Sequence, residues 1–184
     1  MPILKRLYKK FRGKPAPRYL DNSLSRLLCK PWRKWIAQSI APSCPFNCVR
    51  IWLNRLCGFK IGKRCFIGMR CYLDDMCFDL LEIGNHVTIS YGVYFACHGF
   101  RQGHYPIRIL DGTYIGMRAS IISKTSKANP EEGVTIGPRA RIGACTLVNR
   151  DVPPDTTAVG VPCRFLSSNE KFHRHDAHPH RSRI

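Results

Sequence analysis

The chain has 184 residues, room for about one domain, and carries 30 basic against 12 acidic residues, a net charge of +18. No stretch approaches the roughly 18 consecutive apolar residues that span a bilayer. The basic N-terminus lacks the apolar segment and cleavage site of a signal peptide, so we expect a cytoplasmic protein with reduced cysteines. No helix-turn-helix, RNA-binding or zinc-finger pattern accompanies the charge, so no nucleic-acid partner is expected.

The first sixty residues combine basic and aromatic side chains. Residues 1–20 form a basic, Pro-containing arm, and 22–40 mix Leu, Trp and Ile with Arg and Lys around Pro31. Apolar residues at helical spacing predict a short helix over 47–57. Two interpretations stay open. These segments cap the repeats that follow, with a solvated basic face, or they contact an anionic membrane surface at its inner face.

From Ile61 to Phe165 one six-residue phrase recurs: an aliphatic residue, usually glycine, two variable residues, a small residue and one more. Its copies include IGKRCF (61–66), IGMRCY (67–72), LDDMCF (73–78), IGNHVT (83–88), ISYGVY (89–94), IGMRAS (115–120), IGPRAR (136–141) and IGACTL (142–147). This period predicts a parallel β-helix with three hexads in each coil of about 18 residues. Glycine at position two is expected to turn each corner at a backbone angle that other residues avoid.

The aliphatic residue at position one and the small residue at position five are expected to point inward. Cys65, Cys71 and Cys77 recur at position five, which indicates packing in the core. Zinc ligands usually come at C-x2-4-C spacing, and the pair Cys44/Cys48 has no second pair to complete it. No metal is therefore expected.

Three segments depart from the repeat. Residues 79–82 interrupt the frame briefly, and HGFRQGHYPI (98–107) breaks it for longer. KTSKANPEE (124–132) is an insertion, because removing its nine residues restores the frame and predicts that the coil continues beneath it. Function is expected at such excursions.

Three stretches, ISYGVYFACHGF, PIRILDGTYIGMRASI and GVTIGPRARIGACTLVNRDVPPDTTAVGVPCRF, together resemble the hexapeptide-repeat O-acetyltransferases. The resemblance covers about 58–166 and is closest to the maltose/galactoside type and to relatives that modify surface polysaccharides. Its most specific part is NRDVPPDTTAVGVPCR (149–164). The resemblance implies an all-β, left-handed parallel β-helix that forms a homotrimer and binds acetyl-CoA between neighbouring subunits.

Three regions follow from the repeats and the resemblance. Residues 1–58 are expected to form a basic, partly helical extension, and 59–166 the β-helix acyltransferase domain. Residues 167–184, basic and rich in histidine, are expected to form a disordered tail without a metal site.

The resemblance implies that a histidine directly after the coil is the catalytic base, which is His98 here. Imidazole suits this task because its ordinary pKa lies near neutrality. His104 is the alternative base in the same loop. A carboxylate is expected to orient the imidazole or the acceptor: Asp79 is the choice, and Asp74 and Asp75 are the other candidates. An equally good interpretation is that these aspartates cap turns at the interruption and have no catalytic role.

The resemblance also implies contacts with acetyl-CoA. Tyr114 is expected to line the channel, and Met117 and Ala144 to contact the pantetheine arm. Asn149, Arg150 and Arg164 are expected near the nucleotide, where guanidinium groups bind phosphate well. The expected contacts are Tyr114, Met117, Ala144, Asn149, Arg150 and Arg164.

The predicted function is acetyl transfer from acetyl-CoA to a sugar hydroxyl, in the assembly of a surface polysaccharide or glycolipid. Three alternatives stay open. One is a serine-type O-acetyltransferase, although that group carries a larger helical N-terminal domain. The second is a zinc protein like the γ-class carbonic anhydrases, which His86, His98 and His104 suggest. The third is a β-helix scaffold without catalysis.

Overall fold

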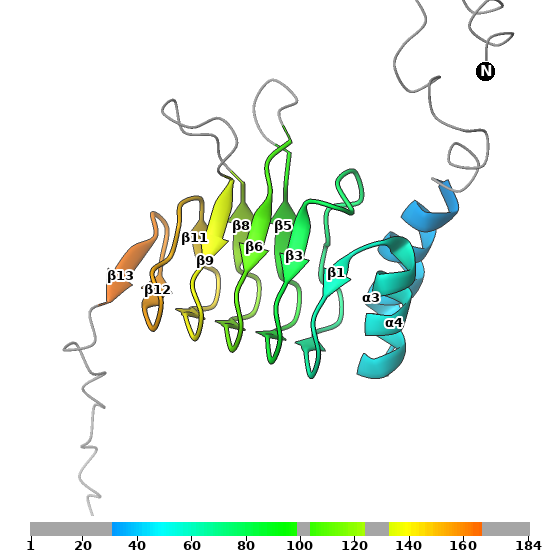
Figure 1. Cartoon of the computed structure of the whole chain (residues 1–184), viewed down its shortest axis with the longest axis horizontal. Helices are drawn as coiled ribbons and strands as arrows, with labels where there is room; N and C mark the ends of the chain where they lie inside the picture. Colours follow the sequence, from blue (N-terminus) through cyan, green and yellow to red (C-terminus); the bar gives the residue numbers. More distant parts are fainter. Residues whose placement is uncertain (1–30, 99–103, 124–132, 167–184) are drawn as a thin grey trace, which may run out of the picture.

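The computed structural model describes residues 31–98, 104–123 and 133–166. The predicted arm over 1–20 and the predicted tail over 167–184 lie outside the described residues. Most of the described chain winds into a left-handed parallel β-helix shaped like a triangular prism, with helices at one end (Figure 1). The predicted fold class is therefore confirmed.

The helices precede the first coil. Residues 31–35 are helical and continue into the π-helical turn η2 (Ile36–Ile40) and the short α3 (Ala41–Ser43). The predicted helix over 47–57 is confirmed as α4 (Asn47–Cys57), which Gly58 ends with a left-handed φ of 102°. None of the helices in these described segments is long and apolar enough to cross a bilayer.

Helix α4 protects the exposed edge of the first coil. The Asn47 side chain donates to the Cys65 carbonyl at 3.1 Å and accepts from the Ile67 N–H at 3.0 Å, while Arg50 Nε donates to the Ile67 carbonyl at 2.6 Å. Side chains thus take the hydrogen bonds that a preceding coil would otherwise make. The capping interpretation of this region agrees with these contacts.

Three sheets form the faces of the prism, and all their strand pairs are parallel except the last, between β12 and β13. The first sheet contains β1 (Lys60–Ile61), β3 (Leu81–Ile83), β6 (Ile107–Ile109) and β9 (Val134–Ile136). The second contains β2 (Phe66–Ile67), β4 (Thr88–Ile89), β7 (Tyr114–Ile115), β10 (Arg141–Ile142), β12 (Thr157–Val159) and β13 (Arg164–Leu166). The third contains β5 (Tyr94–Ala96), β8 (Ser120–Ile122) and β11 (Leu147–Val148).

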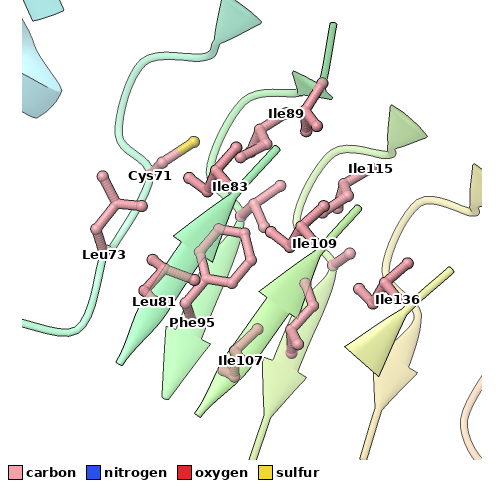
Figure 2. Close-up of a cluster of buried hydrophobic side chains, with 14 of the residues drawn as sticks. Cys71, Leu73, Leu81, Ile83, Ile89, Phe95, Ile107, Ile109, Ile115 and Ile136 are labelled. Atoms are coloured by element: carbon pink, nitrogen blue, oxygen red, sulfur yellow. The ribbon is translucent and has the colours of Figure 1, made fainter. Parts of the chain in front are cut away.

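The inward-pointing residues stack coil upon coil, as Figure 2 shows. In the first sheet Ile83 pairs with Ile109, which pairs in turn with Ile136. All are almost fully buried, and so are the position-five cysteines, so the predicted inward orientation of both positions is confirmed. Burial of these columns supplies the main stabilising term, at about 25 cal/mol per Å² of apolar surface.

The reason predicted for glycine at position two is wrong. The left-handed backbone angles fall at position four instead, where Arg64 and Arg118 have φ of 53° and 55°. Where glycine occupies position two, the next coil lies too close for a side chain: a Cβ on Gly116 would be 2.6 Å from the Ala144 nitrogen. Glycine therefore permits the close stacking of coils.

The coil is interrupted three times at one edge of the prism, each time between a strand or segment of the third sheet and a strand of the first. The first follows Leu73 and returns at β3, so it begins earlier than the predicted interruption over 79–82. The other two separate β5 from β6 and β8 from β9. Because β9 still pairs in register with β6, the predicted continuation of the coil beneath 124–132 is confirmed.

Candidate active site

A histidine and an aspartate meet at this edge. His98 follows β5, and Asp74 starts the excursion that leaves the coil beneath it. His98 Nδ1 lies 2.7 Å from Asp74 Oδ2. The Asp74 side chain is 0% exposed and that of His98 36% exposed, so the pair joins a buried carboxylate to an imidazole that reaches solvent.

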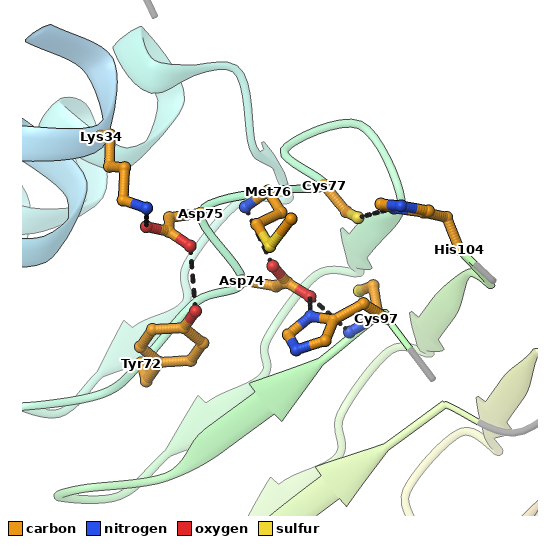
Figure 3. Close-up of polar contacts among 9 residues, drawn as sticks. Lys34, Tyr72, Asp74, Asp75, Met76, Cys77, Cys97 and His104 are labelled. Carbon is orange, nitrogen blue, oxygen red and sulfur yellow. Dashed lines mark hydrogen bonds and ion pairs between the residues drawn. The ribbon is translucent and has the colours of Figure 1, made fainter. Parts of the chain in front are cut away.

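Backbone groups hold the carboxylate in place (Figure 3). The Cys97 N–H donates to Asp74 Oδ2 at 2.7 Å, and the Met76 N–H donates to Oδ1 at 2.9 Å. With its Nδ1–H donating to the same carboxylate, His98 keeps the lone pair of Nε2 free to accept a proton. This arrangement is suited to general base catalysis.

The predicted choice of Asp79 as the orienting carboxylate is corrected by this geometry. Asp79 is exposed, and the carboxylate that contacts His98 belongs to Asp74, one of the two other candidates. The physical reason is the early start of the excursion: Asp74 directly follows the core residue Leu73 and points inward, whereas Asp79 lies on its outer part.

His104, the alternative base, is bridged to His98 through the backbone in antiparallel orientation. Its side chain is exposed, and its Nδ1 contacts the Cys77 thiol rather than a carboxylate. Burial, and after it the negative charge of Asp74, raises the pKa of Cys77 to about 12, so the thiol is protonated at neutral pH. His104 is therefore held by a neutral thiol group, while His98 has an anionic partner.

A second carboxylate network lies next to the first and was not predicted. Asp75 accepts from the Tyr72 hydroxyl at 2.9 Å and pairs with Lys34 Nζ at 2.9 Å (Figure 3). The Tyr72 ring stacks on Tyr94, with centroids 4.5 Å apart. These contacts tie the helices to the excursion that carries Asp74. Two consecutive aspartates at the exit from a coil were the available sequence signal.

The residues expected to contact acetyl-CoA all lie on the surface of the prism, exposed to solvent. Met117 and Ala144 occupy one corner in adjacent coils, and Tyr114 lies on β7 in the second sheet. Asn149 and Arg150 follow β11, at the same edge as His98.

The two arginines lie near the C-terminal hairpin of β12 and β13. Arg150 Nη2 donates to the Cys163 carbonyl at 2.5 Å, and its guanidinium stacks over Phe165 at 4.5 Å. Arg164 lies on β13, opposite Val159, with its side chain exposed. Both guanidinium groups thus belong to one small unit at the end of the coils.

The three histidines of the zinc alternative do not come together. His86 occupies a position-four corner between β3 and β4, on another edge of the prism from His98 and His104. Among residues 31–98, 104–123 and 133–166, no three His, Cys, Asp or Glu side chains are grouped as metal ligands. The hydrogen bond between the His98 imidazole and the Asp74 carboxylate thus remains the main chemical feature of this edge.

Acetyltransferases are among the known proteins similar to this chain, although no protein-family model matches it. Serine acetyltransferase of Bacillus licheniformis is 36% identical over 121 residues, covering 65% of this chain and 50% of the relative. Galactoside O-acetyltransferase of Escherichia coli is 31% identical over 132 residues, covering 62% and 59%. The chain thus spans about half the length of the curated relatives it matches.

Solved structures agree with these relatives. A hexapeptide-repeat acetyltransferase from Vibrio cholerae superposes with a TM-score of 0.60 and 26% identity, over 79% of this chain and 93% of that chain. The same Vibrio cholerae protein has been solved in complex with acetyl-CoA, where the TM-score is 0.54 and the identity 23%.

The fold and the edge site define a left-handed β-helix protein with an aspartate-oriented histidine where the coil opens. The chain resembles the hexapeptide-repeat acetyltransferases: its relatives in sequence include serine and galactoside O-acetyltransferases, and its fold matches that of a hexapeptide-repeat acetyltransferase.

Proposed function

We propose that the protein is an acetyl-CoA-dependent O-acetyltransferase in which His98 is the general base. The observation that carries this proposal is the hydrogen bond of His98 Nδ1 to the buried Asp74, which leaves Nε2 available at the solvent side. A hydroxyl group is a weak nucleophile until a base removes its proton, and a positioned base typically contributes about 10²–10⁴-fold to the rate.

The proposed reaction is direct transfer. His98 Nε2 takes the proton of the acceptor hydroxyl as its oxygen attacks the thioester carbonyl carbon. Asp74 stabilises the resulting imidazolium through Nδ1–H. The carbon–sulfur bond then breaks, and the imidazolium returns the proton to the departing thiolate. No protein thiol is acylated, which agrees with the raised pKa of Cys77 and of Cys97, both caused first by burial.

The exposed residues on the prism fit an extended anionic thioester. Tyr114, Met117 and Ala144 would hold its uncharged arm along exposed coil corners, and Asn149 would lie nearer the nucleotide. Arg150 and Arg164 would bind phosphate, because guanidinium forms strong charge-assisted bonds with it. When bound, acetyl-CoA supplies the activated acetyl group.

The acceptor we propose is a sugar hydroxyl of a surface polysaccharide or glycolipid. Similarity to galactoside O-acetyltransferase supports this class. Serine is the second candidate, favoured by the 36% identity to a serine acetyltransferase.

The test is release of CoA from acetyl-CoA with a panel of sugars, glycolipids and L-serine. Wild type is compared with His98→Ala and with His104→Ala as the matched control in the same loop. We expect acceptor-dependent release that falls about a hundredfold or more in His98→Ala, with acetyl-CoA binding retained.

Each other result is informative. Full activity in His98→Ala together with loss in His104→Ala would move the base to His104. Failure of the wild-type protein to bind acetyl-CoA at all would contradict the reaction class. The acceptor that gives the highest kcat/KM decides between the sugar and serine candidates.

We also infer a homotrimer that works in the cytoplasm, where the acetyl donor is available. The predicted cofactor cleft needs a neighbouring subunit, because its expected residues lie on open faces of the prism. Analytical ultracentrifugation should give a particle of about three times the 21.1 kDa chain mass. A monomer that is fully active would contradict this assembly.

A further inference from the structure

The helices at the end of the prism expose a large amount of apolar surface. We call the side chains Trp32, Trp35, Phe46, Val49, Trp52 and Leu56 the outer helical surface. Their exposed fractions lie between 40% and 67%, and they include all three tryptophans of the chain. Isolated exposed apolar residues need no explanation, but a concentration of this kind indicates an interaction site.

The arrangement on α4 is regular. Its buried residues, among them Ile51 and Asn54, face the coils and the neighbouring helix. Val49, Trp52 and Leu56 recur at a spacing of three and four residues and therefore form one stripe on the opposite side. On the preceding helix Ala37 is buried, and Trp32 and Trp35 are exposed with their rings 5.8 Å apart. Both helices thus bury one side and expose aromatic groups on the other.

A terminal cap of a repeat protein normally has a polar outer face, because that face meets water. The outer face of this cap is instead largely apolar, and its charged residues are almost all basic. Residues 31–60 contain five basic residues, of which Arg50 is buried, and no acidic one, and residues 1–30 contain nine basic residues and one acidic one. Lys34 and Arg55 are exposed among the apolar groups. The combination of tryptophan, aliphatic and basic side chains is typical of surfaces that lie in a membrane interface.

We propose that the outer helical surface docks on a bilayer that contains anionic lipids. Tryptophan and leucine side chains enter the interfacial region, and basic residues pair with the negative lipid headgroups. Charge complementarity favours this occupant over a second copy of the chain. A symmetric contact between two copies would bring two basic surfaces together without acidic partners, whereas an anionic bilayer provides the opposite charge.

Docking would bring the candidate active site close to the membrane surface. Lys34, beside the exposed tryptophans, pairs with Asp75, the neighbour of the carboxylate that orients His98. Asp75 and Asp74 therefore lie next to the helices that carry the outer helical surface, as Figure 3 shows, and His98 contacts Asp74 there. Resting on the function proposed above, this placement points to an acceptor held at the bilayer, such as a lipid-linked glycan.

The test is flotation of the full chain with vesicles of phosphatidylcholine alone or mixed with phosphatidylglycerol, without acetyl-CoA or acceptor. We expect flotation with the anionic vesicles, together with a blue shift of tryptophan fluorescence, because every tryptophan lies on the proposed surface. Brominated lipid should quench that fluorescence in the wild-type protein, a measurement that requires no variant.

The double variant Trp52→Gln/Leu56→Gln should reduce the partition coefficient about tenfold or more, since it removes two large apolar groups. Leu110→Gln, an exposed leucine on the β6–β7 turn, is the matched control and should float like wild type. Circular dichroism and thermal unfolding check that both variants fold.

Three results would overturn the proposal. The first is no flotation with anionic vesicles. The second is equal flotation of wild type and Trp52→Gln/Leu56→Gln, which would leave charge elsewhere as the cause. The third is a larger wild-type assembly in solution that the double variant dissociates, which would make a second copy the occupant. None of these depends on acetyl transfer, so the proposed enzyme activity is tested separately.

Discussion

The hydrogen bond between His98 and Asp74 joins two residues 24 positions apart, each at the end of its coil. Oδ2 of Asp74 accepts from both the His98 ring and the Cys97 backbone, each at 2.7 Å. The backbone contact fixes the carboxylate, and the carboxylate fixes the ring. The tautomer and the orientation of the His98 ring thus depend on a carboxylate that is itself buried.

Asp74→Asn should lower kcat about a hundredfold or more with little change in KM for acetyl-CoA. The amide keeps the shape of the side chain but cannot stabilise an imidazolium, and it can favour the wrong tautomer of His98. Steady-state kinetics with a fixed acceptor measure the effect.

Asp79→Asn is the matched control, because it changes an exposed carboxylate in the same excursion. It should retain nearly full activity. Equal losses in the two variants would mean that the charge of the whole loop matters, and not the contact with His98.

Sequence reasoning named His98 as the base, which stays a prediction, and did not single out the carboxylate that contacts it. The histidine could be found because a family motif lies directly before it in an unbroken hexad. The aspartate could not be assigned, because the frame between Leu73 and β3 is irregular and spacing alone does not say where the chain leaves the coil. The contact of Lys34 with Asp75 could not be predicted for the same reason, since it joins the helices to that irregular segment.

At the scale of the coil, two positions of the hexad shape each corner: position two, where glycine leaves room for the next coil, and position four, where the backbone is left-handed. A glycine such as Gly116 allows the close approach of the next coil, and Arg118 carries the left-handed angle two residues later. A left-handed backbone at arginine raises the conformational energy by about 1 kcal/mol, and the pairing of the strands on both sides offsets this strain.

Gly116→Ala should destabilise the protein by about 1–3 kcal/mol, because the new Cβ would meet the backbone nitrogen of Ala144 at 2.6 Å. Gly143→Ala should cost less, because there the nearest atom, at 2.9 Å, is a side-chain methyl of Val159 that can move. Urea unfolding of the two variants provides the comparison. The reverse order would show that backbone proximity does not set the glycine requirement.

The three sheets could be predicted from the sequence, because a six-residue period shows which side chains point inward and which strands lie above one another. The glycine rule was predicted for the wrong reason, because a sequence does not distinguish a residue chosen for its backbone angle from one chosen for lack of a side chain. Only the stacked coils make that distinction, at Gly116 as at its equivalents.

The core of the whole molecule contains thiols that affect its response to pH. Burial raises the pKa of several of them above 9.0, and that of Cys77 to about 12. In the unfolded chain a thiol ionises near 9.0. Between pH 9 and 12 the folded form therefore binds more protons, and folding stability falls as the pH rises through this range.

We expect the free energy of unfolding to be constant just below pH 9 and clearly lower at about pH 11. Cys77→Ala should reduce the alkaline loss, whereas Cys48→Ala, which removes an exposed thiol, should not. Urea titrations at the two pH values measure the difference. An alkaline loss that is the same in wild type and Cys77→Ala would contradict the contribution of this thiol.

The shared edge from which the three excursions leave also determines how such a molecule can diversify. Ile61 stays opposite Ile83, and Ile109 opposite Ile136, whatever length of chain lies between them. Insertions and deletions at this edge therefore leave the register of every strand intact. Natural selection, or a protein engineer, can therefore replace the segments around His98 one at a time, while the strands beneath keep their pairing.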